Sequence, residues 1–290
     1  MGYDYENLCN DIECFIKKYK SVSVRSIGKS VMGRNLYCLK AGRGAQRVLL
    51  LGAYHGLEYL TAAFLMRFME EYMNYVHNGE VYFGYNTSSL FDNVTLFAVP
   101  MVNPDGVDIA VNGLDITNEY HRNIISMAGI HSFNSVWQAN ANGVDLNHNH
   151  DADFSMVAEK PSPTKFCGEF PESEPESRAV AEFVRKTGID ILLTFHSQGK
   201  EIYYDFNGII PDKTILIAQR MAEESGYTLS IPQGSAAFGG CKDWFISEFG
   251  KPGFTVEIGL GKNPLPIEML KDIYEENARL ILCAMEESIR

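Results

Sequence analysis

The hydrophobic positions of the chain alternate between short continuous runs and longer stretches with helical spacing. Continuous apolar runs predict strands that are buried on both faces of a sheet; they cover residues 48–51, 94–99, 189–195 and 254–258. Stretches with an apolar residue on every helical turn predict helices; they cover residues 5–20, 58–76, 174–186, 214–226 and 267–289. This alternation predicts an α/β sheet with helices on both faces.

The rest of the pattern predicts an edge hairpin and long loops. Residues 22–27 alternate like a strand, and turn residues separate them from the short apolar segment 36–39. Residues 112–139 and 151–175 have little periodicity, and long loops in a compact enzyme commonly wall an active site. No repeat or composition shift marks a boundary, so we expect a single domain over residues 1–290.

Composition and charge narrow the function classes. The chain is 46% hydrophobic and 21% charged, which is typical of a folded globular protein. Its net charge is −12 and it has no run of Lys and Arg, so we expect no nucleic-acid partner. No segment resembles a signal peptide or a membrane span, and the six cysteines are widely spaced. We therefore expect a cytoplasmic protein with reduced thiols and no membrane contact; the oligomeric state stays open.

Imidazole and carboxylate side chains occur where the predicted strands end. His55 and Glu58 are three residues apart after one apolar run, and His196 follows another. Alone, His196 would be a structural histidine at the sheet edge. Zinc hydrolases take three protein ligands and keep a fourth position for water, and ligands bind at strand ends in α/β sheets. Glu257, a carboxylate among apolar residues, should face a cation. Together these positions indicate a zinc site.

The order of the motifs resembles the zinc carboxypeptidase family along nearly the whole chain. The matching motifs are His55-x-x-Glu58, Asn103-Pro104-Asp105-Gly106, Gly143-Val144-Asp145-Leu146-Asn147, His196-Ser197 and Glu257. The resemblance implies a mixed, mostly parallel sheet of about eight strands. It implies one zinc ion held by His55, Glu58 and His196, with Glu257 as general base.

Two of these motifs also have simpler interpretations. The resemblance makes Asp145 an acceptor that orients a ligand histidine, while the alternative is a residue that caps a turn. Asn103-Pro104-Asp105-Gly106 is interpreted as a strong turn after a strand.

The chain departs from the family pattern at the substrate-binding positions. Where the family has an arginine that holds the substrate's terminal carboxylate, the pair here is Asn147-His148. Histidine lacks the bidentate fork of a guanidinium group. Gln138 stands in place of the arginine that polarises the scissile carbonyl, so Arg122 and His148 are candidates for that role, unless Arg122 is a solvated loop residue.

Two further departures concern the side-chain pocket. Ser235 occupies the place of the family's substrate-binding tyrosine. The resemblance puts Lys242 in the pocket for the side chain after the cut bond, where a lysine favours a substrate with an acidic group; the alternative is a lysine that points to solvent.

These departures resemble one branch of the family, the bacterial γ-D-glutamyl-meso-diaminopimelate peptidases. The resemblance implies hydrolysis of the amide between γ-D-glutamate and a diamino acid in peptidoglycan stem peptides, with a peptide or muropeptide as partner. We expect soluble muropeptides rather than intact wall. The alternatives are a metallocarboxypeptidase that releases acidic C-terminal residues, an N-acyl amino acid deacylase, and a muropeptide-binding protein without turnover.

Overall fold

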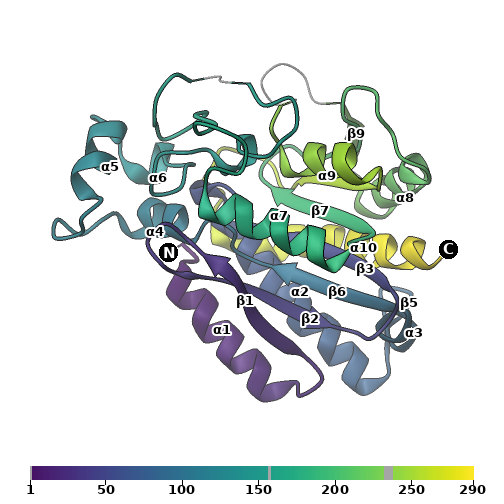
Figure 1. The fold of residues 1–290 in the computed structure, drawn as a ribbon. Helices are drawn as coiled ribbons and strands as arrows, with labels where there is room; N and C mark the ends of the chain where they lie inside the picture. Colours follow the sequence, from purple (N-terminus) through teal and green to yellow (C-terminus); the bar gives the residue numbers. More distant parts are fainter. Residues whose placement is uncertain (1, 156–157, 232–237) are drawn as a thin grey trace.

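A twisted eight-stranded sheet lies between helices in this computed structural model, which describes residues 2–155, 158–231 and 238–290 (Figure 1). In spatial order the strands are β1 (Ser23–Lys29), β2 (Asn35–Ala41), β6 (Val94–Val99), β3 (Gln46–Leu51), β7 (Ile191–His196), β10 (Gly253–Glu257), β8 (Glu201–Tyr203) and β9 (Thr228–Ser230). The central strands β6, β3, β7 and β10 run parallel, whereas β2 and β8 pair antiparallel with them. The predicted mixed, mostly parallel sheet is confirmed.

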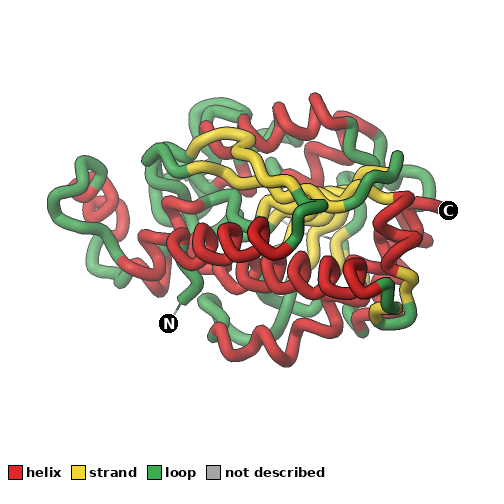
Figure 2. Tube along the Cα trace, turned by 90° about the horizontal axis from the view of Figure 1, so that it is seen from below, coloured by secondary structure: helices red, strands yellow, loops and turns green. Residues whose placement is uncertain are grey.

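Helices cover both faces of the sheet (Figures 1 and 2). One face packs against α1 (Tyr5–Lys18), α2 (Tyr59–Asn78), α8 (Thr214–Ser225) and α10 (Leu270–Ile289). The other face packs against α7 (Pro175–Thr187) and α9 (Cys241–Phe249). A small hairpin of β4 (Val81–Tyr82) and β5 (Tyr85–Asn86) and the short helix α3 (Thr87–Asn93) precede β6. No helix in the described part of the chain is apolar over a length that could cross a bilayer.

The apolar runs explain why the central strands are buried on both faces. Side chains alternate between the two faces of a strand. In β3, Val48 and Leu50 belong to the apolar core beneath α2 and α10, while Leu49 and Leu51 belong to the core beneath α7 and α9. All four side chains are fully buried. A strand covered on both sides has no polar face, which is why it reads as a continuous apolar run.

The structure corrects the expectation of a simple turn at Asn103-Pro104-Asp105-Gly106. These residues begin helix α4 (Pro104–Asn112). The Asn103 side chain accepts a hydrogen bond from the Gly106 N–H at 2.9 Å, and Pro104 occupies the first helical position. Asparagine caps and first-turn prolines are favoured at helix starts because the first N–H groups lack helical partners.

The long segment between α4 and α7 is also more ordered than predicted. It contains α5 (His121–Ala128), α6 (Phe133–Val136) and the 3-10 turn η2 (Leu146–His148). Figure 1 shows α5 and α6 outside the helix and sheet layers. The buried side chains of Ile124 and Trp137 tie this segment to the apolar cluster that contains Leu57 and Ile109. Tertiary packing therefore supplies the order that the local sequence pattern does not signal.

Candidate metal centre and active site

The predicted site residues meet at the carboxyl ends of the central parallel strands. His55 follows β3, and Glu58 lies in the 3-10 turn η1 (Gly56–Glu58) that leads into α2. His196 is the last residue of β7, and its register partner is Glu257, the last residue of β10. The turn at Gly56 requires glycine because a Cβ atom there would lie 2.3 Å from the Gly106 carbonyl oxygen. Close packing of η1 against α4 thus fixes the approach of His55 and Glu58.

His55, Glu58 and His196 form a compact group of nitrogen and oxygen donors. The two Glu58 carboxylate oxygens lie 2.9 Å from His55 Nδ1 and 3.0 Å from His196 Nδ1. The two imidazole Nδ1 atoms are 3.3 Å apart. The three ligand atoms lie within 4.8 Å of one another, and this is the one such group among the described residues. Two imidazole nitrogens and a carboxylate oxygen are a donor set typical of catalytic zinc, so the residues fit that ion.

Electrostatics at the site favour positive charge. Burial opposes the charged form of Glu58, but His55 and His196 outweigh it and lower the pKa of Glu58 to about 2. Burial likewise disfavours the imidazolium of His55, yet the Glu58 and Asp145 carboxylates raise the pKa of His55 well above its ordinary value. The buried carboxylates thus favour a positive charge between them, and a divalent metal ion would supply that charge.

Asp145 contacts the imidazole ring of His55, a predicted zinc ligand, on the side opposite Glu58. Its Oδ1 atom lies 3.1 Å from His55 Nε2, the ring nitrogen that faces away from Glu58. The Lys165 N–H donates to Oδ2 at 3.0 Å and holds the carboxylate in place. Asp145 also accepts a hydrogen bond from the Asn147 N–H at the start of η2, so it is both a turn cap and a partner of the imidazole. A carboxylate in this position fixes the ring orientation and raises its basicity.

Glu257 lies beside the donor group in a cavity of about 180 Å³. The cavity is lined by His55, Asn147, His148, His196, Tyr203, Gly240, Lys242, Asp243, Thr255 and Glu257. Burial, followed by the nearby charge of Glu58, raises the pKa of Glu257 well above its ordinary value. A carboxylate with a raised pKa is suited to accept a proton and to pass it on.

The substrate-binding candidates separate into two groups. Asn147, His148 and Lys242 line the cavity, and Lys242 is 3% exposed, so it does not point to solvent. Gln138 and Arg122 do not line this cavity in the described part of the chain. Arg122 is exposed on α5, and the Gln138 carbonyl oxygen accepts the Gly56 N–H at 3.0 Å. Ser235 lies outside the described residues.

Sequence reasoning missed several residues of the cavity. Thr255 and Tyr203 line it, and Thr255 lies two positions before Glu257 on β10, so the two-residue strand period could have indicated it. Asn263, which is not among the residues that line the cavity, donates through Nδ2 to Glu58 at 3.3 Å and to the Ser197 carbonyl oxygen at 2.6 Å. Nothing local in the sequence signals this long-range contact.

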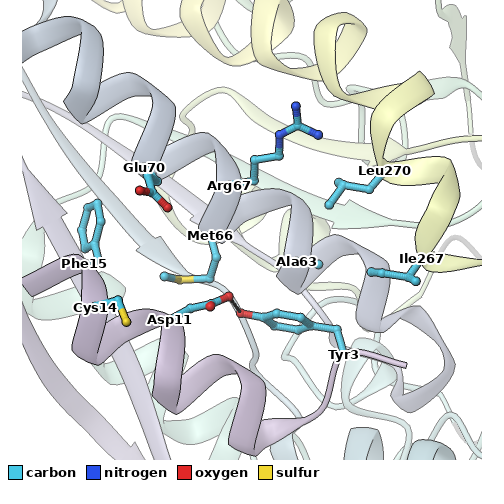
Figure 3. Close-up of a pocket in the computed structure, with 10 residues that line it drawn as sticks. All are labelled: Tyr3, Asp11, Cys14, Phe15, Ala63, Met66, Arg67, Glu70, Ile267 and Leu270. Atoms are coloured by element: carbon cyan, nitrogen blue, oxygen red, sulfur yellow. Dashed lines mark hydrogen bonds between the residues drawn. The ribbon is translucent and has the colours of Figure 1, made fainter. Parts of the chain in front are cut away.

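A second cavity, of about 250 Å³, lies between α1, α2 and the start of α10 (Figure 3). Tyr3 and Asp11 meet there through a 2.6 Å hydrogen bond, and Met66, Arg67 and Leu270 are among the other residues that line it. None of the predicted zinc ligands, nor Glu257, contributes to it. The strand-end cavity is therefore the candidate active site.

Comparison with known proteins decides the family. The model of the zinc carboxypeptidases matches residues 9–280. The chain belongs to the zinc carboxypeptidase family. It is accordingly a zinc metallopeptidase, and His55, Glu58 and His196 form the group positioned for the ion.

Relatives of this zinc carboxypeptidase include bacterial proteins that match almost the whole chain. It is 34% identical to the gamma-D-glutamyl-L-diamino acid endopeptidase 1 of Lysinibacillus sphaericus, over 98% of this chain and 72% of that protein. It is 33% identical to the uncharacterised protein YqgT of Bacillus subtilis, over 98% of this chain and 77% of that protein.

Solved structures show the same fold. Bovine thrombin-activatable fibrinolysis inhibitor, in complex with tick carboxypeptidase inhibitor, superposes with a TM-score of 0.79 at 20% identity, over 100% of this chain and 98% of that chain. The murein-tripeptide amidase MpaA of Escherichia coli O157 superposes with a TM-score of 0.60 at 20% identity, over 90% of this chain and 92% of that chain. At these identities the likeness concerns the fold.

Proposed function

We propose that this metallopeptidase hydrolyses the amide between γ-D-glutamate and a diamino acid, such as meso-diaminopimelate, in peptidoglycan stem peptides. The observation that carries the proposal is the polar lining of the cavity. No arginine lines it among the described residues; Asn147, His148 and Lys242 stand there instead. The 34% identity to a gamma-D-glutamyl-L-diamino acid endopeptidase supports the same substrate class.

His148 supports cleavage within a peptide rather than strict removal of a terminal residue. Its Nδ1 atom lies 2.8 Å from the Phe238 carbonyl oxygen, so Nδ1 carries the proton in the neutral ring. The Nε2 atom of that neutral ring is an acceptor and cannot donate to a carboxylate. Only the imidazolium form donates there, and it lacks the two-pronged geometry of guanidinium. A site without a permanent carboxylate clamp tolerates a substrate that continues beyond the diamino acid.

The chain's own residues divide the catalytic work. Bound zinc lowers the pKa of water to about 7 and polarises a carbonyl group. In the proposed mechanism Glu257 accepts a proton from the attacking water and delivers it to the nitrogen of the departing diamino acid. Asp145 holds His55 through Nε2, which keeps the opposite ring nitrogen directed at Glu58. The remaining walls, Asn147 and Thr255 among them, orient the substrate.

A panel of defined peptides tests the proposal. The zinc-loaded protein is incubated with a γ-D-glutamyl-meso-diaminopimelate tripeptide, its tetrapeptide extension, α-linked peptides with acidic C-termini and N-acyl amino acids, and products are identified by mass spectrometry. We expect cleavage of the γ-linked peptides alone. We also expect a chelator that removes the zinc to stop this cleavage. Cleavage of the α-linked peptides alone would indicate the acidic carboxypeptidase, and cleavage of acyl amino acids alone the deacylase. Binding without any turnover would indicate a muropeptide-binding protein. The cytoplasmic location stays a prediction, which cell fractionation tests.

A further inference from the structure

Cationic side chains gather at the amino ends of the central strands, the opposite end from the strand-end cavity. They line a hollow of about 500 Å³. They come from β1, β2, the turn between β2 and β3, β3 and the last turn of α7: Arg25, Lys40, Arg43, Arg47 and Lys186. The other lining residues are Gly44, Thr95, Phe97 and Thr187, so no carboxylate lines the hollow among the described residues. The chain as a whole carries a net charge of −12, so this concentration of positive charge is local.

Strand pairing directs these cations to one face of the sheet. Lys40 of β2 is the register partner of Phe97, and Arg47 of β3 is the partner of Thr95, two positions earlier on β6. Paired residues, and residues two positions apart on one strand, share a face. Phe97 belongs to the apolar core beneath α7 and α9, so this is the face that α7 covers. The hollow begins where α7 ends, at Thr187.

Several of these cations lack a carboxylate partner. The Arg25 guanidinium lies 5.2 Å from the centre of the Phe183 ring. The Arg47 guanidinium donates to the Thr187 carbonyl oxygen. In the described part of the chain the ion pairs around the hollow involve other cations, and Arg25, Lys40 and Arg47 form none. Their positive charge is therefore not balanced within the chain.

The carboxylates near the hollow are engaged outside it. Two ion pairs at its rim have both side chains more than half exposed: Arg43 with Asp92 at 2.7 Å and Lys186 with Glu182 at 2.8 Å. Exposed pairs of this kind contribute little free energy, so a ligand can replace the carboxylate. Asp190 accepts the backbone N–H of Arg47 and pairs with Lys251. It leaves the Arg47 guanidinium without a negative partner.

The chemistry of the hollow suits phosphate groups. A hollow lined by one sign of charge over an apolar wall concentrates ions of the opposite sign. Thr95 and Phe97 line it and are each 6% exposed, so its floor adjoins the protein core. Guanidinium groups bind phosphate oxygens in a two-pronged geometry, and ammonium groups add point charges.

The size of the hollow and the charge of the whole chain favour a compact ligand. A volume of about 500 Å³ is in the range of small-molecule sites. A nucleic acid or an anionic bilayer would extend past the hollow onto a chain of net charge −12, which would repel it. A small anion with several charges would meet the cations alone.

We propose that this hollow binds a compact, soluble anion that carries two or more phosphate groups. Arg25, Lys40 and Arg47 supply the unbalanced positive charge, and Arg43 and Lys186 exchange their exposed carboxylates for phosphate oxygens. The site goes beyond the proposed peptidase function and does not depend on it.

Sodium tripolyphosphate is the probe, and isothermal titration calorimetry of the zinc-loaded protein measures its binding. We expect one tripolyphosphate per chain, with an affinity that falls as the salt concentration rises. Inorganic phosphate should bind at least tenfold more weakly, because a single phosphate reaches fewer of the cations. Absence of tripolyphosphate binding overturns the proposal, and so does binding no tighter than that of inorganic phosphate.

A matched pair of double variants assigns the binding to the hollow. Arg25→Gln with Lys40→Gln removes two exposed cations that line it, and we expect the affinity for tripolyphosphate to fall at least tenfold. Lys20→Gln with Lys271→Gln removes two exposed cations that do not line it, and should leave the affinity unchanged. Thermal unfolding verifies that both variants are folded.

The comparison also controls for net charge and for the zinc ion. Both double variants lose the same charge and keep the same zinc ligands, so tripolyphosphate bound to zinc would not distinguish them. Equal affinities in the two double variants therefore contradict a site in the hollow.

Vesicles of phosphatidylglycerol and phosphatidylcholine test a lipid source of phosphate. We expect no cosedimentation of the protein with them. Cosedimentation that the Arg25 and Lys40 double variant loses, without binding of tripolyphosphate, would replace the soluble ligand with a membrane surface. Hydrolysis of γ-linked peptides is measured separately, and its failure would overturn the proposed function while leaving this site standing.

Discussion

Glu257 and His196 are register partners at the ends of two adjacent parallel strands. Paired residues of neighbouring strands project to the same face of a sheet, so the proposed general base and a proposed zinc ligand are held by one hydrogen-bonded ladder. The positions of both side chains depend on β7 and β10, which lie in the buried centre of the sheet. Side chains on rigid strands hold a catalytic geometry more precisely than side chains on mobile loops do.

Replacing Glu257 by glutamine tests its role in proton transfer. Glutamine preserves the size of the side chain but cannot accept a proton, so we expect kcat to fall by about 100- to 10,000-fold. Zinc content and thermal unfolding should stay near those of the unmodified protein. Glu268→Gln, at an exposed position, serves as the control. Unchanged turnover by the Glu257 variant would remove it from the mechanism.

Asp145→Asn tests the support of His55. The asparagine keeps an oxygen near His55 Nε2 but removes the negative charge that raises the basicity of the ring, so we expect zinc affinity to fall by about 10- to 100-fold. Competition with a chromogenic chelator measures this affinity. If Asp145 serves only as a turn cap, the variant will lose stability while its zinc affinity is retained.

Removal of zinc should stop hydrolysis and lower stability. An ion that binds only the folded chain stabilises it by about 2.7 kcal/mol when its concentration is 100 times the dissociation constant. We expect chelator-treated protein to unfold at a lower temperature and added zinc to restore both temperature and activity. Full activity after complete removal of metal, verified by elemental analysis, is incompatible with a zinc peptidase.

A buried glutamate outside the cavity predicts a pH dependence of stability. Burial raises the pKa of Glu176 to about 8, and its oxygens contact the Val31 N–H and the Asn140 side chain rather than a cation. Between an unfolded pKa of 4.5 and the folded value, the folded state holds a proton that the unfolded chain has released. The free energy of unfolding therefore falls as pH rises through this window, by up to about 1.4 kcal/mol per pH unit.

Glu176→Gln should remove that contribution, so its unfolding free energy should depend less steeply on pH from 5 to 8. Denaturant unfolding of both proteins at several pH values measures the difference. Identical slopes would mean that Glu176 is ionised in the folded state.

Much of the fold could be predicted because its central strands are buried on both faces. Residues 94–99 were predicted as a strand, and β6 spans the same residues; the predicted helix at 58–76 differs from α2 by one or two residues at each end. Helix α9 was not predicted, because its first turn carries the polar pair Lys242 and Asp243, which face a cavity rather than solvent. Its apolar residues pack on the sheet only through tertiary contacts.

The donor group could be predicted from the sequence because binding sites in α/β sheets form at the carboxyl ends of strands. His55, Glu58 and His196 all follow or end predicted strands. The charge state of the pocket could not. Lys242 suggested a free cation, but its ammonium group pairs with the neighbouring Asp243, and folding brings the Asp205 carbonyl oxygen to it from 37 residues away. A hydrogen bond to a backbone carbonyl oxygen that is distant along the chain leaves no periodic signal in the sequence.

X-ray data collected at the zinc absorption edge from crystals of the zinc-loaded protein test the central claim most directly. The account predicts one anomalous peak per chain, at about 2.0–2.2 Å from donor atoms of His55, Glu58 and His196 and beside Glu257. A peak bound by other residues, or none at these three side chains, would contradict it.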